Sequence, residues 1–177
     1  MLEKLHEQTI ELQGGHGFEA EPLPEQMRFI RFRIGHQELL IAVDAVVQVS
    51  GAGTISAFPG VSRYLQGLFV TRGEEVTPVV DLAELLGLTW QKAMASQCCL
   101  VVTLGGERFA LLVDSVSELV SYDASLLEKS HSDLFGSGVS VVSGVIKDAE
   151  SVFPVINVNA IFQAVFIGES RYEHTTH

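Results

Sequence analysis

The sequence predicts an all-β protein built from two small closed barrels, and three observations lead to that expectation. Short segments rich in valine, isoleucine and leucine alternate with glycine-containing turns along most of the 177 residues. The second half of this pattern repeats the first. Helical signals are limited to short turns that begin at a capping residue. A chain of this length can bury a sizeable core without disulfides or metal ions.

Composition restricts the partners and the compartment. Eleven basic residues against 22 acidic ones give a net charge of -11, which repels the phosphate backbone of nucleic acids and anionic lipid. No apolar run approaches the ~18 residues that a membrane span needs, so we expect no direct membrane insertion. The amino-terminal residues lack the basic start and apolar stretch of a signal peptide, and we therefore expect a cytoplasmic protein.

Residues 1–27 differ from the rest of the chain, and we interpret them as an acidic tail and linker. Glutamates greatly outnumber the single lysine there, and Gly14-Gly15-His16-Gly17, Pro22 and Pro24 interrupt any regular element. Residues 166–177 form a second tail at the carboxyl end. The globular part is therefore expected over residues 28–165.

The globular part begins with a predicted β-hairpin. Ile30, Phe32 and Ile34 alternate with arginines, and Gly35 supplies a turn before the apolar run of residues 39–43. Residues 46–49 continue as a further extended piece. This alternation is typical of strands that bury one face.

A second hairpin is predicted over residues 67–82. Two apolar segments flank the charged turn Arg72-Gly73-Glu74-Glu75, in which the glycine can take positive φ. Pro78 cannot donate a backbone hydrogen bond, so it belongs at the start of its strand or on an edge. Asp81 has the spacing of a helix cap and Gly87 offers a stop, which predicts a short helix after the hairpin.

The second half of the chain repeats this unit. Aligning Gly105 on Gly35 shifts the sequence by 70 residues and matches the apolar positions on both sides of the turn. Aligning Pro154 on Pro78 shifts it by 76 residues and matches the segment that follows each proline. Such self-similarity indicates two copies of one β-unit.

Each copy holds about five short strands, which is the spacing of a small closed barrel. We expect barrel one over about residues 28–95 and barrel two over about residues 96–165, packed side by side with a groove between them. Asp44 and Asp114 occupy equivalent places in the two copies. We interpret them as structural residues that accept backbone N–H groups at a turn.

No reactive arrangement of residues accompanies these strands. The neighbouring Cys98 and Cys99 would point to opposite faces of a strand, so they are poorly placed to bridge or to bind one metal ion. The six histidines are scattered over tails, turns and loops without the spacing of metal ligands. The sequence has neither a nucleophile elbow nor a phosphate-binding loop. We therefore predict no catalytic residues, no metal, no cofactor and no enzymatic activity.

A family resemblance extends over nearly the whole globular part. The residues that carry it are Phe29-Ile30-x-Phe32-x-Ile34-Gly35, Phe58-Pro59-Gly60, Arg72-Gly73, Pro78-Val79-Val80-Asp81-Leu82, Leu111-Leu112-Val113-Asp114 and Pro154-Val155-Ile156-Asn157. In this order they resemble the CheW-like domain of bacterial chemotaxis. The Arg-Gly followed by Pro-Val-x-Asp-Leu is the most specific part.

This resemblance implies two five-stranded SH3-like barrels related by a pseudo-two-fold. It also implies a non-catalytic adaptor that couples the cytoplasmic tip of a chemoreceptor to the regulatory domain of a histidine kinase. Arg72 matches the arginine of the family's Asn-Leu-Arg-Gly motif, and Val46, Gln48 and Gly67 fall where family members build coupling surfaces. These four residues are the partner-binding candidates.

Three departures from the family pattern concern the partners. Val70-Thr71 replaces Asn-Leu before Arg-Gly, Ser62 replaces a frequent proline, and Gln48 stands where many members have an acid that can pair with the arginine. These changes favour a divergent adaptor in a non-flagellar chemosensory pathway. Three of the four candidates also have a structural interpretation: Gly67 as a turn glycine, Val46 as barrel core and Arg72 as a solvated charge.

The residues leave two other functions open. One is a kinase regulatory domain, which has the same fold, cut from a longer protein. The other is a small-molecule sensor or an enzyme built on tandem barrels, which a ligand screen by thermal shift or a panel of hydrolase substrates would detect.

Overall fold

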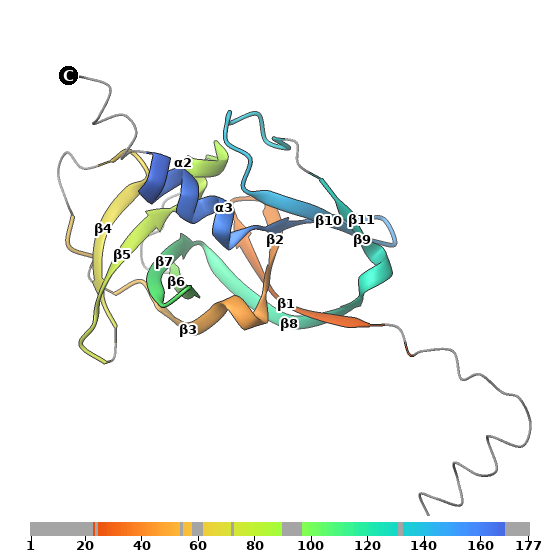
Figure 1. Ribbon diagram of the computed structural model, residues 1–177, viewed down its shortest axis with the longest axis horizontal. Helices are drawn as coiled ribbons and strands as arrows, with labels where there is room; N and C mark the ends of the chain where they lie inside the picture. Colours follow the sequence, from red (N-terminus) through yellow and green to blue (C-terminus); the bar gives the residue numbers. More distant parts are fainter. Residues whose placement is uncertain are drawn as a thin grey trace, which may run out of the picture.

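The protein is described by a computed structural model that covers residues 23, 25–53, 55–57, 62–71, 73–89, 97–130 and 133–168. Its strands form two sheets, each curled into a barrel-like unit (Figure 1). The six-stranded barrel has the order β8 (Ser115–Asp123), β1 (Gln26–Ile34), β2 (Gln37–Ala42), β11 (Ser151–Ile156), β10 (Val142–Asp148) and β9 (Leu127–Lys129). The five-stranded barrel has the order β3 (Val46–Gly51), β6 (Cys98–Leu104), β7 (Glu107–Val113), β5 (Val76–Asp81) and β4 (Leu65–Val70). The predicted all-β class is therefore confirmed.

Short helices connect and cover these strands. They are η1 (Val43–Ala45), α2 (Leu82–Leu86), η3 (Ala124–Leu126), α3 (Val158–Phe162) and its π-helical continuation η4 (Gln163–Ile167). The helical chain runs to Ile167, so the predicted polar tail over residues 166–177 overlaps the end of η4. Most of the predicted amino-terminal tail lies outside the described residues, and β1 begins two residues before the expected boundary, at Gln26.

The sheets do not follow the predicted division near residue 95. Hairpin β1–β2 joins the strands of the second repeat, and hairpin β6–β7 joins those of the first. The chain crosses between the barrels at η1, after β2, and again at Asp114, after β7. The expectation of five strands in each barrel also needs correction, because β9 gives one sheet a sixth strand of three residues. The two repeats, which follow one another in the sequence, therefore exchange hairpins. Periodicity along the sequence does not predict this exchange.

The exchanged strands pair in equivalent ways in the two barrels. Phe32 of β1 lies opposite Val116 of β8, and Val46 of β3 lies opposite Val102 of β6, which are the same two positions of the repeat with the copies interchanged. The parallel contacts show the same relation, because Leu40 lies beside Val155 as Ala110 lies beside Val79. The predicted pseudo-symmetry is thus visible at the level of single residue pairs.

The largest hydrophobic core lies between the barrels. Strands β1 and β6 and helices α2 and α3 all contribute buried residues to it, among them Phe32, Leu100, Leu85 and Ile161. Adjacent residues of one strand serve different cores, since Phe29 packs inside the six-stranded barrel while Ile30 packs in the core between the barrels. Strands that are apolar on both faces therefore hold the two units together.

Capping residues begin the two α-helices at equivalent positions. The Asp81 carboxylate accepts a hydrogen bond from the Glu84 N–H at 3.1 Å, and the Asn157 side chain accepts one from the Ala160 N–H at 3.1 Å. Gly87 ends α2 in the left-handed conformation with φ of 69°. The predicted short helix and its cap are confirmed. The Glu84 side chain does not complete a capping box, because it forms an ion pair with Arg63 at 2.7 Å.

Asp114 joins the two barrels at the crossover. Its carboxylate accepts a hydrogen bond from the Gly35 N–H in the β1–β2 turn, and its own N–H donates to the Arg33 carbonyl at 2.9 Å. The predicted structural role is confirmed for Asp114. The same carboxylate also fixes the exchanged hairpin against the end of β7.

Candidate partner-binding surface

Strand β3 carries two of the four predicted partner-binding residues. Val46 is partly buried and packs against the core between the barrels, as its structural interpretation requires. Gln48 follows a bulge in the β3–β6 pairing and is also half-buried. Within the described chain, the Gln48 Nε2 atom is buried without a hydrogen-bond partner. Neither side chain is fully exposed for contact with a partner.

Gly67 is buried at a point where two backbones approach closely. A Cβ atom added there would lie 2.2 Å from the Ser56 carbonyl oxygen, so no larger residue fits without displacement of the backbone. Gly144 occupies the equivalent bulge of the other barrel, where a Cβ would lie 2.5 Å from the Glu128 carbonyl oxygen. The close approach of the two backbones explains why a glycine is needed at position 67, whether or not a partner binds there.

Arg72, the fourth candidate, lies outside the described residues. The chain on either side of it forms the β4–β5 turn, in which the Glu74 N–H donates to the Thr71 carbonyl at 2.9 Å. Glu74 takes the positive φ of 61° that the sequence had led us to expect at Gly73. The hydrogen bonds of the turn determine that Glu74 takes the positive φ, even though a glycine stands next to it.

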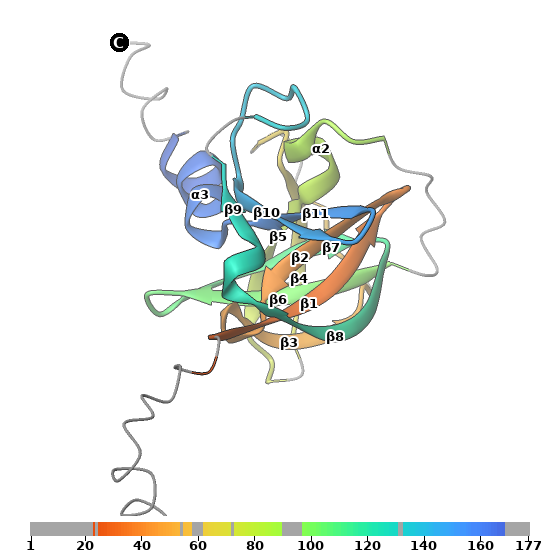
Figure 2. The ribbon, with the colours of Figure 1, turned by 90° about the vertical axis from the view of Figure 1, so that its right-hand side faces the viewer.

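Sequence reasoning missed an exposed apolar surface beside the buried candidates. Val47 and Val49 project from β3 with 48% and 46% of their surface exposed, and Leu119 projects from β8 with 52% exposed. Val49 and Leu119 are equivalent positions of the repeat, and β3 and β8 run along the same side of the molecule (Figures 1 and 2). We call these three residues the β3–β8 face. The signal was available, because valines at 46, 47 and 49 place apolar residues on both faces of one strand.

A second apolar patch lies on the β4–β5 hairpin. Val70 and Val76 are direct cross-strand partners, and each exposes more than half of its surface, 59% and 60% respectively. We call this pair the β4–β5 patch. It adjoins the turn that contains Arg72.

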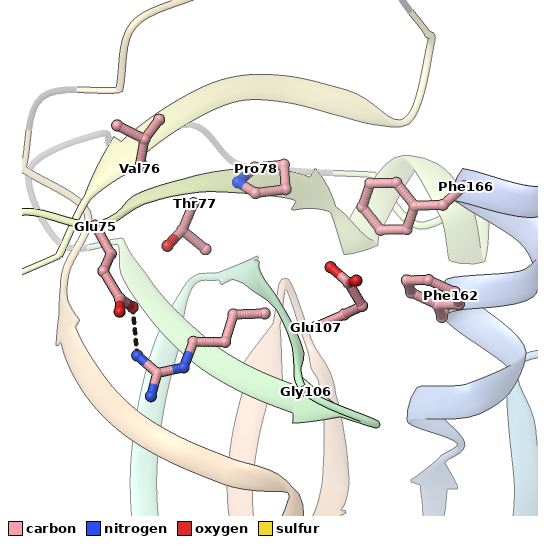
Figure 3. Close-up of a pocket in the computed structure, with 9 residues that line it drawn as sticks. Glu75, Val76, Thr77, Pro78, Gly106, Glu107, Phe162 and Phe166 are labelled. Carbon is pink, nitrogen blue, oxygen red and sulfur yellow. Dashed lines mark hydrogen bonds and ion pairs between the residues drawn. The ribbon is translucent and has the colours of Figure 1, made fainter.

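A hollow of about 770 Å³ opens next to this patch, between β5, the β6–β7 turn and the carboxyl-terminal helices. Phe162 and Phe166 project from α3 and η4 toward Pro78 and Glu107 (Figure 3). The Glu75 carboxylate forms an ion pair with the Arg108 guanidinium at one side of the hollow. Its lining therefore combines an aromatic wall with charged side chains.

Many family members have an acid where this protein has Gln48, and here the corresponding acid is found in the second repeat. Arg31 donates a hydrogen bond to Glu118 at 2.7 Å, and Glu118 is the residue equivalent to Gln48 in the second repeat. The Arg31 guanidinium also donates to the Tyr122 hydroxyl at 2.7 Å and lies 4.6 Å from the centre of the Phe153 ring. The acid that position 48 lacks is thus present in the other barrel, where it holds Arg31 at the end of the barrel interior.

The described residues contain no group of three histidine, cysteine, aspartate or glutamate side chains placed to hold a metal ion. Burial raises the pKa of the Cys99 thiol to about 11, which leaves it protonated at neutral pH. No helix of the described chain is long and apolar enough to cross a membrane.

Comparison with known proteins agrees with this geometry. Residues 28–166 match the model of the CheW-like domain, and the chain belongs to this family. It is 26% identical over 133 residues to a probable chemotaxis protein CheW of Rhizobium etli, covering 75% of this chain and 85% of the relative. It is 28% identical over 138 residues to the chemotaxis protein CheW of Rhizobium meliloti, covering 71% and 86%. The crystal structure of the scaffolding protein TtCheW from Thermoanaerobacter tengcongensis has the same fold, with a TM-score of 0.68, 19% identity and coverage of 76% and 90%.

Proposed function

We propose that this protein is a non-catalytic cytoplasmic adaptor that couples chemoreceptors to a chemotaxis-type histidine kinase. The observation that carries the proposal is the family match, which spans residues 28 to 166 and so nearly the whole described fold. The relatives named above are chemotaxis proteins, and the structural relative is a scaffolding protein. The departures at Gln48 and at Val70-Thr71 support a non-flagellar pathway.

Two separate apolar surfaces support an adaptor role, because an adaptor must hold two partners at once. The β3–β8 face follows two strands on the same side of the molecule and suits the helical tip of a receptor, whose apolar side would lie along it. The β4–β5 patch is compact and suits a folded domain such as the kinase regulatory domain. Signalling would then proceed by differential contacts in two receptor states, with no bond made or broken in the adaptor.

The test is titration calorimetry with a purified receptor signalling fragment and a purified kinase regulatory domain from the same organism. Val49→Asp should weaken receptor binding by about tenfold or more while kinase binding stays unchanged. Val76→Asp should do the reverse. Leu134→Asp is the matched control, since it adds the same charge at another exposed apolar residue and should leave both affinities unchanged.

Arg72 enters the same experiment as the remaining candidate. Arg72→Glu should weaken one partner without lowering the thermal midpoint, whereas unchanged affinity for both would remove it from the interface. The adaptor role is wrong if the unmodified protein binds neither fragment, and the assignment of surfaces is wrong if Val49→Asp and Val76→Asp affect the same partner.

A further inference from the structure

The interiors of the two barrels differ at several positions that the repeat makes equivalent. At five such positions the five-stranded barrel holds the smaller side chain. The pairs, with the six-stranded barrel first, are Phe29 and Cys99, Leu40 and Ala110, Val120 and Ser50, Tyr122 and Ala52, and Phe153 and Thr77. At two other equivalent positions the five-stranded barrel holds the larger side chain, with Leu112 in place of Ala42 and Phe69 in place of Ile146. These two changes restore only part of the lost apolar surface.

The interior of the six-stranded barrel is held by aromatic packing. The rings of Phe29 and Tyr122 are 6.4 Å apart, and those of Tyr122 and Phe153 are 6.3 Å apart. Arg31 covers this cluster through its hydrogen bonds to Tyr122 and Glu118 and its contact with the Phe153 ring. Tilted aromatic pairs with a cation above one ring contribute more than their buried area alone.

The interior of the five-stranded barrel lacks such packing and contains unpaired polar atoms. Phe69 is the only aromatic residue of its buried cluster among the described residues. The Ser50 Oγ and Gln48 Nε2 atoms are buried, and neither has a hydrogen-bond partner in the described chain. On the six-stranded barrel the Arg31 Nε atom is also buried without a partner, but the same guanidinium makes two other hydrogen bonds. A buried polar group without a partner lowers the stability of the state that buries it.

Closure of the two barrels differs as well. The six-stranded barrel gains β9, whose three residues pair with β10 in a continuous ladder. At the equivalent place in the five-stranded barrel, the described chain after β3 contacts β4 through the single bridge between Ser56 and Leu68. Fewer ladder hydrogen bonds at a sheet edge reduce the cost of local opening.

We infer that the five-stranded barrel is a locally opening unit and the six-stranded barrel is the stable one. Strands β3, β4 and β5 would open in the native protein while their equivalents β8, β10 and β11 stay closed. Both apolar surfaces include residues of the opening unit, namely Val49 and the β4–β5 patch. If the proposed function holds, binding of either partner would therefore tighten this barrel, but the inference itself concerns the free chain.

Native-state hydrogen exchange on the full chain tests the inference. After correction for intrinsic rates, backbone amides of β3, β4 and β5 should exchange roughly fivefold to thirtyfold faster than amides at equivalent positions of β8, β10 and β11. Equal exchange in the two sets, or faster exchange in β10 and β11, would overturn it. The result is independent of whether the chain binds any partner.

Paired variants make the comparison specific to the interior. Ser50→Val gives the five-stranded barrel the residue of its equivalent, and it should slow exchange in β3 to β5 by about fivefold or more. Val120→Ser is the reciprocal change and should speed exchange in β8, β10 and β11. If Ser50→Val does not fold, Ser50→Ala removes the unpaired hydroxyl without adding volume and should slow exchange in the same strands. Exchange in β3 to β5 that is unaltered in the Ser50 variants would contradict the role given to this interior.

Discussion

The thiol of Cys99 is fully buried on β6, whereas Cys98 beside it is partly exposed. Because burial raises the pKa of Cys99 to about 11, very little thiolate exists at mildly alkaline pH, and the thiolate is the nucleophile. We predict that iodoacetamide labels Cys98 in the native protein and labels both cysteines after denaturation. Intact-mass spectrometry counts the adducts. Equal labelling of Cys98→Ala and Cys99→Ala native proteins would contradict the prediction.

The bulge glycines give a second prediction at single positions. Gly67→Ala and Gly144→Ala should each lower the free energy of unfolding by about 1–3 kcal/mol, because the new methyl group collides with a backbone carbonyl. Gly73→Ala is the matched control, since no atom lies within 4 Å of a Cβ built there. Urea unfolding measures all three. A stable Gly67→Ala that fails to bind a partner would instead make Gly67 a contact residue.

Helix α2 depends on the cap that precedes it. Removal of the Asp81 carboxylate leaves the Glu84 N–H without its acceptor, so Asp81→Ala should lower stability by about 0.5–2 kcal/mol. Asp81→Asn keeps an acceptor oxygen and should retain most of that stability. Asn157→Ala tests the equivalent cap of α3 by the same denaturation measurement. A loss with Asp81→Asn as large as with Asp81→Ala would show that charge, and not capping, is what the residue supplies.

The loop over residues 133–138 is organised by the carboxylate of Asp133. This carboxylate accepts hydrogen bonds from the N–H groups of Gly138 and Phe135, and the first of these is the main reason that its pKa lies below the usual 3.8. A lowered native pKa stabilises the fold above pH 3.8, and that contribution is lost as the pH falls through this value and below it. Asp133→Asn should therefore be less stable than the natural protein at neutral pH, with the difference vanishing in acid. A difference that is the same at both pH values would contradict this account.

Exchange of hairpins ties the two repeats into one folding unit. Each barrel needs the β-hairpin of the other repeat, so fragments 1–95 and 96–177 should each lack cooperative unfolding when they are purified alone. Mixing them should restore a native circular dichroism spectrum and a single unfolding transition. A fragment that unfolds cooperatively by itself would show that one repeat is an independent domain.

Much of the local structure follows from short-range patterns in the chain. Alternation from Ile30 to Ile34 and the helix cap at Asp81 are properties of neighbouring residues, and the shift of 70 residues is found by comparing the sequence with itself. All three appear in the structure. Val46 and Gly67 were singled out by the family resemblance. Whether such positions face a partner or the interior depends on distant segments of the chain, and only the structure shows that they are buried.

Contacts between distant segments decided the rest. Because a strand with two apolar faces can pair in either barrel, periodicity is the same whether a hairpin stays with its own repeat or is exchanged. The β3–β8 face, the covering of one barrel by Arg31 and the hollow beside Phe162 each join residues that lie far apart in the chain. Local pattern therefore specified the strands and the repeat, and the pairing between repeats determined which side chains remain exposed for a partner.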